Sequence, residues 1–280
     1  MPAFDTPAPI SATAHVEAGS LQLTAGDRRD TVVEVRPRDP KKDLDVRTAE
    51  QTEVTCVNGV LTVRTPKSGL FGRIGTVDVA VELPAGSHAE VTGAWTQLHG
   101  VGRLGEVRVR ISTGDVRLDT TGPLQLKASH GSITVDRVEG TAEITTSSGS
   151  LRAGLLGGPA VLKNSHGSTT VGAATGELRV NGANGDIDIR RAEDSVTATT
   201  AHGTLRVDEV ASGSVQLETS YGAIDVGVRE GTAAWLDVHS GSGQVRNTLT
   251  ASETPQESED TVTIRARTRH GSIDVHRAKI

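Results

Sequence analysis

Apolar and polar residues alternate along most of the chain, and a glycine interrupts the alternation at regular intervals. Residues 129–135, which read SHGSITV, show the motif: a small or polar residue, then Gly, then alternating residues. The spacing of the anchor glycines is about 18 residues, with one insertion before the last copy. The anchors are Gly114, Gly131, Gly149, Gly167, Gly185, Gly203, Gly222, Gly241 and Gly271.

The positions around each anchor glycine follow one template. Positions −7, −5, +2 and +4 relative to the anchor are Ala, Val, Ile or Leu in 34 of 36 cases, the exceptions being Thr169 and Gly243. The interleaved positions +1 and +3 are polar in 17 of 18 cases. Alternation with a period of two on both sides of a glycine corner predicts two half-buried strands in each repeat.

Two short strands and two corners in about 18 residues suit one coil of a β-solenoid, in which each strand pairs in parallel with its counterpart in the next coil. A propeller blade would need four strands. A β-sandwich is the alternative, but its strands would not repeat their spacing so evenly. We therefore expect an all-β, single-domain, β-helix-like solenoid with glycine corners.

We expect one elongated domain over residues 1–280, because an interrupted solenoid core is still continuous. Weaker copies of the template around Gly19 and Gly59 indicate irregular early coils and a cap in residues 1–95. This part includes a glycine-rich loop at 67–75. The pattern then predicts regular coils at 96–249, an acidic loop at 250–260 and a last coil at 261–280.

Composition and charge exclude several classes of protein. The net charge of −6 argues against broad nucleic-acid binding. A single cysteine, Cys56, allows no internal disulfide. No apolar run reaches the length of a membrane span, and the first ten residues lack the pattern of an export signal. We therefore expect a cytoplasmic protein with no nucleic-acid partner and no direct membrane insertion.

Several segments resemble the DUF4097 family of bacterial β-strand-repeat proteins, which are labelled putative adhesins. The resemblance implies a β-solenoid and no established reaction, and it supplies no catalytic residues. The absence of a visible membrane anchor is typical of an unanchored form, and the excess of Arg (23) over Lys (6) is typical of an actinobacterial source. The segments that carry the resemblance are residues 4–10 (FDTPAPI), 31–36 (TVVEVR), 81–86 (VELPAG), 260–267 (DTVTIRAR) and 271–275 (GSIDV).

Six of the nine histidines fall in or beside corners, roughly one in every second coil. A column of histidines could bind a metal, with His130, His166 and His202 as candidate ligands. Two coils would separate consecutive members by about 10 Å, whereas the ligands of one zinc ion lie about 2 Å from the metal. A turn role is the favoured interpretation. The six are His99, His130, His166, His202, His239 and His270.

Two further features could carry a site. Asp186 and Asp188 share one strand face about 7 Å apart, but the matching positions of neighbouring coils supply no third carboxylate, so a solvated sheet surface is favoured over a polysaccharide-cleaving site. Trp235 occupies an outward position where polar residues are the rule. It is the candidate for partner binding, unless the 250–260 loop covers it.

The sequence favours a non-enzymatic interaction or assembly scaffold that binds a protein partner or a second copy of itself. We predict no catalytic residue and no cofactor. Exposed terminal strands would polymerise, so caps must prevent or regulate end-to-end stacking. Two alternatives stay open: a metal-binding protein or enzyme that uses the histidine corners, and a surface adhesin exported by an unseen route.

Overall fold

Strands dominate the structure, a computed structural model that describes residues 1–66, 75–249 and 260–279. By its contacts the chain divides into two units, residues 1–139 and 140–280, and each unit is a β-solenoid. The prediction of one continuous domain stays a prediction. The predicted glycine-rich loop at 67–75, except for its last residue, lies outside the described residues, as do residues 250–259 of the predicted acidic loop.

The first unit contains twelve strands and one helix among its described residues. The bounds are β1 (Ala3–Asp5), β2 (Ser11–His15), β3 (Ala18–Gly26), β4 (Asp30–Pro37), α1 (Asp43–Glu50), β5 (Glu53–Val57), β6 (Val60–Arg64), β7 (Val77–Pro84), β8 (His88–Arg103), β9 (Val107–Thr113), β10 (Val116–Thr121), β11 (Leu124–His130) and β12 (Ile133–Val138).

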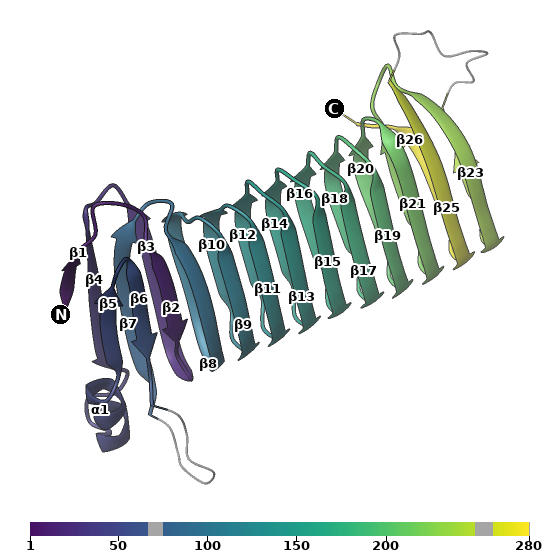
Figure 1. The fold of residues 1–280 in the computed structure, drawn as a ribbon. Helices are drawn as coiled ribbons and strands as arrows, with labels where there is room; N and C mark the ends of the chain where they lie inside the picture. Colours follow the sequence, from purple (N-terminus) through teal and green to yellow (C-terminus); the bar gives the residue numbers. More distant parts are fainter. Residues whose placement is uncertain (67–74, 250–259, 280) are drawn as a thin grey trace. The chain divides into compact units, whose positions relative to one another are not determined.

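Parallel pairing builds the coils of the first unit, but their order in space differs from their order in the chain. The long strand β8 pairs with β9 and β10, which in turn pair with β11 and β12. On its other side β8 pairs with β2 and β3, and these pair with β6 and β7. The coil made by β2 and β3 therefore lies between β8 and the later strands β6 and β7 (Figure 1).

The outer part of the first unit departs from the repeat. The expected coil around Gly59 is instead a tight hairpin, because Asn58 and Gly59 both have positive φ and β5 pairs with β6 in antiparallel fashion. Antiparallel pairing also joins β4 to β7 and β1 to β4. Helix α1, which the strand pattern did not predict, packs against β4 and β7. Regular coils also begin earlier than expected, because β8 starts at residue 88 and β2 is already in register with it.

The second unit contains fourteen strands among its described residues. Their bounds are β13 (Ala142–Ser148), β14 (Leu151–Leu156), β15 (Ala160–His166), β16 (Thr169–Ala174), β17 (Leu178–Asn184), β18 (Ile187–Ala192), β19 (Val196–His202), β20 (Leu205–Val210), β21 (Gly213–Tyr221), β22 (Ile224–Val228), β23 (Ala233–Ser242), β24 (Val245–Asn247), β25 (Thr261–His270) and β26 (Ile273–Arg277).

The expected last coil, 261–280, does not lie at the end of the stack. Strand β25 pairs in parallel with β21 on one side and with β23 on the other, and β26 lies in the same way between β22 and β24. Figure 1 shows β25, coloured yellow, between the two green strands β21 and β23. The outermost coil of this unit is therefore β23 with β24, and the C-terminal segment fills the position inside it.

Each coil turns at a glycine that has no room for a side chain. Gly203 has φ +148°, and a Cβ on it would lie 2.1 Å from the carbonyl oxygen of Gly185 in the preceding coil. The expected corner at Gly241 is in fact at Gly243, which has φ +155° and approaches the carbonyl oxygen of Gly271. Both the backbone conformation and the spacing of the coils thus require glycine at these corners.

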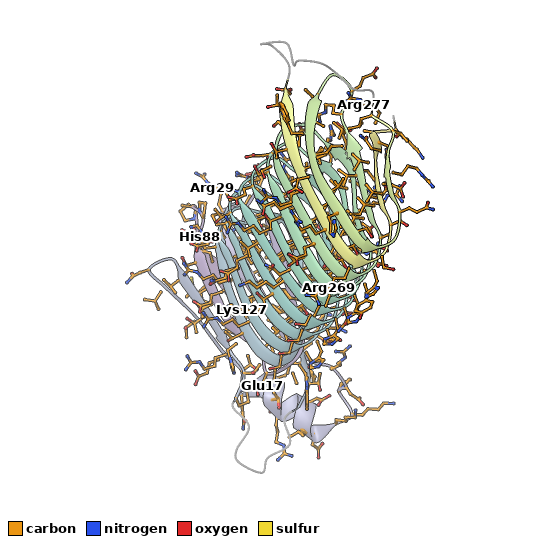
Figure 2. The ribbon with its side chains drawn as sticks, turned by 90° about the vertical axis from the view of Figure 1, so that its right-hand side faces the viewer. Glu17, Arg29, His88, Lys127, Arg269 and Arg277 are labelled. Atoms are coloured by element: carbon orange, nitrogen blue, oxygen red, sulfur yellow. The ribbon has the colours of Figure 1, made fainter. Side chains whose placement is uncertain are left out.

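The predicted alternation places apolar side chains inside and polar ones outside. Inward residues such as Leu126 and Ile187 are buried, whereas Lys127 and Arg269 project from the outer surface of their strands (Figure 2). The core consists of aliphatic side chains. The fold class predicted from the sequence, an all-β solenoid with two strands per coil, is confirmed.

Candidate functional site

The position just before each corner glycine forms an exposed column along the second unit. Strand register places His166 between Ser148 and Asn184, and it places His202 between Asn184 and Tyr221. In the first unit, His130 lies beside Thr113 in the equivalent position. These three candidate histidines are exposed and never occupy adjacent coils.

His99 and His239 do not belong to this column. His99 pairs with Arg117 beyond the corner, and His239 pairs with Arg267. The column position of the outermost coil holds Ser242, which pairs with His270. The displacement of His239 follows from the corner being at Gly243.

Three aromatic rings of the column stack on one another. The ring of Tyr221 lies nearly parallel to that of His202, with centroids 5.1 Å apart, and to that of His270, with centroids 4.8 Å apart. All three side chains are exposed. The centroid separations match the spacing of paired strands, so the register of the coils holds the stack. The sequence could not predict the contact with His270, because it depends on the insertion of β25 beside β21.

The structure does not bring metal ligands together at the histidine corners. No group of three or more His, Cys, Asp or Glu side chains within the described ranges could hold a metal ion. The Nδ1 atom of His166 lies 3.3 Å from the carbonyl oxygen of Ser147 in the preceding coil. The metal hypothesis for His130, His166 and His202 gains no ligand set from this arrangement.

The two aspartates on one strand face have separate roles. The Oδ1 atom of Asp186 accepts a 2.7 Å hydrogen bond from the backbone N–H of Thr204 in the next coil, which stabilises the corner. Burial, together with the neighbouring Asp186 carboxylate, raises the pKa of Asp188 above its ordinary value. The register places Asp188 between Thr170 and Arg206, so neither residue paired with it in the adjacent coils is a carboxylate.

A second ladder, buried beneath the column, was missed by the sequence reasoning. At several corners the residue three positions before the glycine is polar and buried, and its side chain donates to a corner carbonyl oxygen of the preceding coil; Thr146, in the same position, makes no such bond. Thr219 donates to Gly203 at 3.1 Å, and Thr268 donates to Gly222 at 3.0 Å. A buried polar residue at a fixed offset from the glycine was the signal that could have revealed it.

A shallow polar groove of about 450 Å³ crosses the outer face of the first unit. Its polar side chains, which include those of Gln22, Gln97, His99, Asp115 and Arg117, come from strands β3, β8, β10 and β12 and from the segments before β10 and β12. The polar residues that line the groove occupy ordinary outward positions of the coils, so the sequence analysis did not single it out.

Trp235 lies on β23, the outermost strand of the second unit, where its side chain is 64% exposed. It points outward as the sequence predicted and is next to Thr263 of β25. The inward residues of the same strand, Leu236 and Val238, are only half-buried. Exposed and half-buried apolar side chains therefore occur together on this strand. Whether the predicted acidic loop covers Trp235 concerns residues outside the described part of the chain.

No helix within the described residues is long and apolar enough to cross a membrane.

Several solved structures are similar to this chain at low sequence identity. A putative adhesin from Parabacteroides merdae is 15% identical, with a TM-score of 0.47 over 79% of this chain and 92% of that chain. A putative lipid binding protein from Parabacteroides distasonis is 12% identical, with a TM-score of 0.45 over 99% and 96%. A putative adhesin from Bacteroides fragilis is 13% identical, with a TM-score of 0.38 over 98% and 95%.

The chain has no match among curated proteins. The family model described as Toastrack DUF4097 matches residues 15–278, which is nearly the whole chain and includes both units. This match confirms the resemblance that the corner motifs carried. The chain belongs to the Toastrack DUF4097 family.

Proposed function

We propose that the chain is a non-enzymatic interaction scaffold that binds a protein partner through the outermost coil of its second unit. The observation that carries this proposal is the exposure of Trp235 on an edge strand. Tryptophan combines a large apolar surface with a hydrogen-bond donor, and it is enriched among the residues that dominate binding energy at protein interfaces. The regular coils hold that strand in place and provide its rigid support.

A second exposed tryptophan shows why position matters. Trp95 of β8 is 69% exposed, close to the value for Trp235. Its strand, however, is paired on both sides, with β3 and with β9. Trp95 therefore offers a side chain alone, whereas Trp235 is accompanied by half-buried apolar neighbours and by a strand edge that no other described strand pairs with.

Site-specific photo-crosslinking in the native host tests the proposal. A photoreactive amino acid replaces Trp235 in one variant and Trp95 in a matched control. We expect covalent adducts with a discrete protein from position 235 and few or none from position 95. Equal yields from the two positions, or none from either, would show that β23 is not the contact surface.

The cellular location decides which form the interaction takes. We propose that the protein acts in the cytoplasm, as expected from the sequence. Fractionation of the native host into cytosol, membrane and medium measures this directly. Recovery in the cytosol directs the search to intracellular partners, whereas recovery at the surface would replace this proposal with adhesion by an exported protein.

A further inference from the structure

The outermost coil of the second unit has a strand edge without a partner strand among the described residues. Strand β23 pairs with β25 alone, and β24 pairs with β26 alone. The opposite edge of β23 thus presents unpaired backbone N–H and C=O groups along a ten-residue strand. Such an edge is a template for one more strand.

The core is also open at this edge. Leu236 and Val238 are half-buried, whereas their neighbours in the adjacent coil, Ile264 and Ala266, have no exposed surface. On the other sheet Val245 is 45% exposed, while the corresponding Ile273 is fully buried. A further layer placed on this coil would bury these apolar side chains, and that burial favours association.

The edge lacks the features that normally prevent pairing. Natural edge strands are protected by Pro, Lys, inward-pointing charges or short length. Residues 233–247 contain neither Pro nor Lys. The inward positions of β23, at Leu236, Val238 and Ser240, carry no charge. The strand is therefore competent to pair.

The outer edge of the first unit is built differently. Its outlying strands β1 and β5 have only three and five residues and are joined in antiparallel fashion. Helix α1 packs beside them on β4 and β7. That edge does not continue the two-strand coil that β23 and β24 present. An edge that matches only itself gives a closed two-fold dimer, whereas a filament needs two different edges that match.

We propose that β23 pairs in antiparallel fashion with β23 of a second copy, about a two-fold axis through Val238. The inference rests on the proposed function and names its partner. In this register Asp237 faces His239 of the second copy, and the pair occurs twice across the axis. A carboxylate that faces an imidazole ring can accept a hydrogen bond from the ring N–H, and such cross-strand polar pairs favour pairing. Facing residues in this register differ by an even number of positions. Leu236 and Val238 of both copies therefore stay on the inner side of the extended sheet.

The same register places Trp235 opposite Gly241 of the second copy. An aromatic side chain that covers a facing glycine is a stabilising pair in sheets. Asp237 also forms ion pairs with Arg265 and Arg267 of β25, at 3.2 and 2.8 Å. The occupant that fits this edge is a second copy of the chain.

Disulfide trapping tests the register. Val238→Cys is made in the full chain together with Cys56→Ser, which removes the native thiol. On the two-fold axis the two introduced thiols face each other within the range of about 4.4–6.8 Å between Cα atoms that a disulfide needs. We expect a covalent dimer after mild oxidation. Thr263→Cys in the same background, an exposed position one strand further in, is expected to stay monomeric.

Sedimentation velocity of the unmodified protein gives the second readout. We expect a mass twice that of the chain, and we expect Val238→Asp to halve it while circular dichroism shows an unchanged β-sheet content. A monomer at all accessible concentrations, or trapping at Thr263→Cys as strong as at Val238→Cys, would overturn the two-fold pairing. If the protein is a monomer but position 235 still captures another protein in the host, the interaction scaffold stands and only the second copy is excluded as its partner.

Discussion

Tyr221 and His270 stack ring on ring with centroids 4.8 Å apart, although they are 49 positions apart in the sequence. The contact exists because β25 lies directly beside β21. Strands β23 and β24, which come between them in the chain, are displaced to the outside. The contact between these two exposed rings therefore depends on the order of the coils. It would be lost if β25 no longer paired with β21.

Gly271→Ala should be strongly destabilising. A Cβ at this position would lie 2.0 Å from the carbonyl oxygen of Gly222, and the backbone has φ +153°. We expect a loss of about 3 kcal/mol or more in the free energy of unfolding, measured in urea. Gly26→Ala is the matched control, since a Cβ there meets nothing within 4 Å and φ is unexceptional. Equal effects of the two substitutions would contradict the close approach.

Thr219→Val tests the buried ladder. The substitution keeps the shape of the side chain but removes the hydroxyl that donates to the carbonyl oxygen of Gly203 at 3.1 Å. We expect a loss of about 1–2 kcal/mol, because that oxygen then lacks a buried donor. Thr263→Val, an exposed outward threonine on β25, should change the stability by less than about 0.5 kcal/mol. Urea unfolding of the two variants distinguishes these outcomes.

Glu193 should contribute stability only where its carboxylate is charged. Arg229 donates two 2.8 Å hydrogen bonds to it and thereby lowers the pKa of Glu193 below its ordinary value. A lowered pKa in the folded state means that the contribution is complete above the unfolded pKa and is lost as the pH falls through the folded pKa. Because both side chains are partly exposed, we expect only about 0.5 kcal/mol. Glu193→Gln should therefore be less stable than the unmodified protein at neutral pH and equally stable in strong acid.

Asp188 should have the opposite effect. Burial and the nearby Asp186 carboxylate raise the pKa of Asp188, so the folded state disfavours the charged form. Stability from this group is therefore gained as the pH falls through the folded pKa. Asp188→Asn removes the charge, and we expect a gain of up to about 0.5 kcal/mol at neutral pH. Thermal unfolding at neutral pH measures the gain, and a lower melting temperature for the variant would contradict it.

The histidine corners should not form a zinc site. His130, His166 and His202 have no histidine in the adjacent coil positions. We expect the combined variant His130→Ala, His166→Ala, His202→Ala to bind zinc no differently from the unmodified protein in calorimetric titration, and to unfold at the same urea concentration. A loss of a stoichiometric zinc ion in the variant would establish the metal alternative.

The sequence predicted the coil well because two independent constraints act on the same residues. Alternation sets which side chains enter the core, and the corner requires glycine both for its conformation and for its close contact with the preceding coil. Positions around Gly131 and Gly185 satisfy both constraints. The exposed column followed directly, since it is the position next to that glycine.

The same alternation could not place the corner of the outermost coil. Gly241 and Gly243 are two residues apart, and a shift by two leaves every side chain on the same face. With Gly241 as the anchor, one template position, Gly243, is not an apolar residue. With Gly243 as the anchor, the one such position is Asn247. The structure distinguishes them by the φ of +155° at Gly243 and by the pairing of Ser242 with His270.

The order of the coils was beyond the sequence for a different reason. All coils present similar edges, so the local sequence pattern does not indicate whether β25 pairs with β21 or lies outside β23. Helix α1 was missed because the repeat template searches only for alternation, and residues 43–50 interrupt it. Aliphatic burial alone does not choose between neighbouring coils of the same shape.

The inserted β25 has a consequence for biosynthesis. The ribosome releases β23 and β24 before β25 and β26 exist, so the place beside β21 is vacant when the outer coil is already available. A chain that added coils strictly in the order of synthesis would put β23 in that place and leave β25 outside. The native arrangement can be completed only after residue 277 has been made, and domain-by-domain folding from the N-terminus therefore ends with a step that is not sequential.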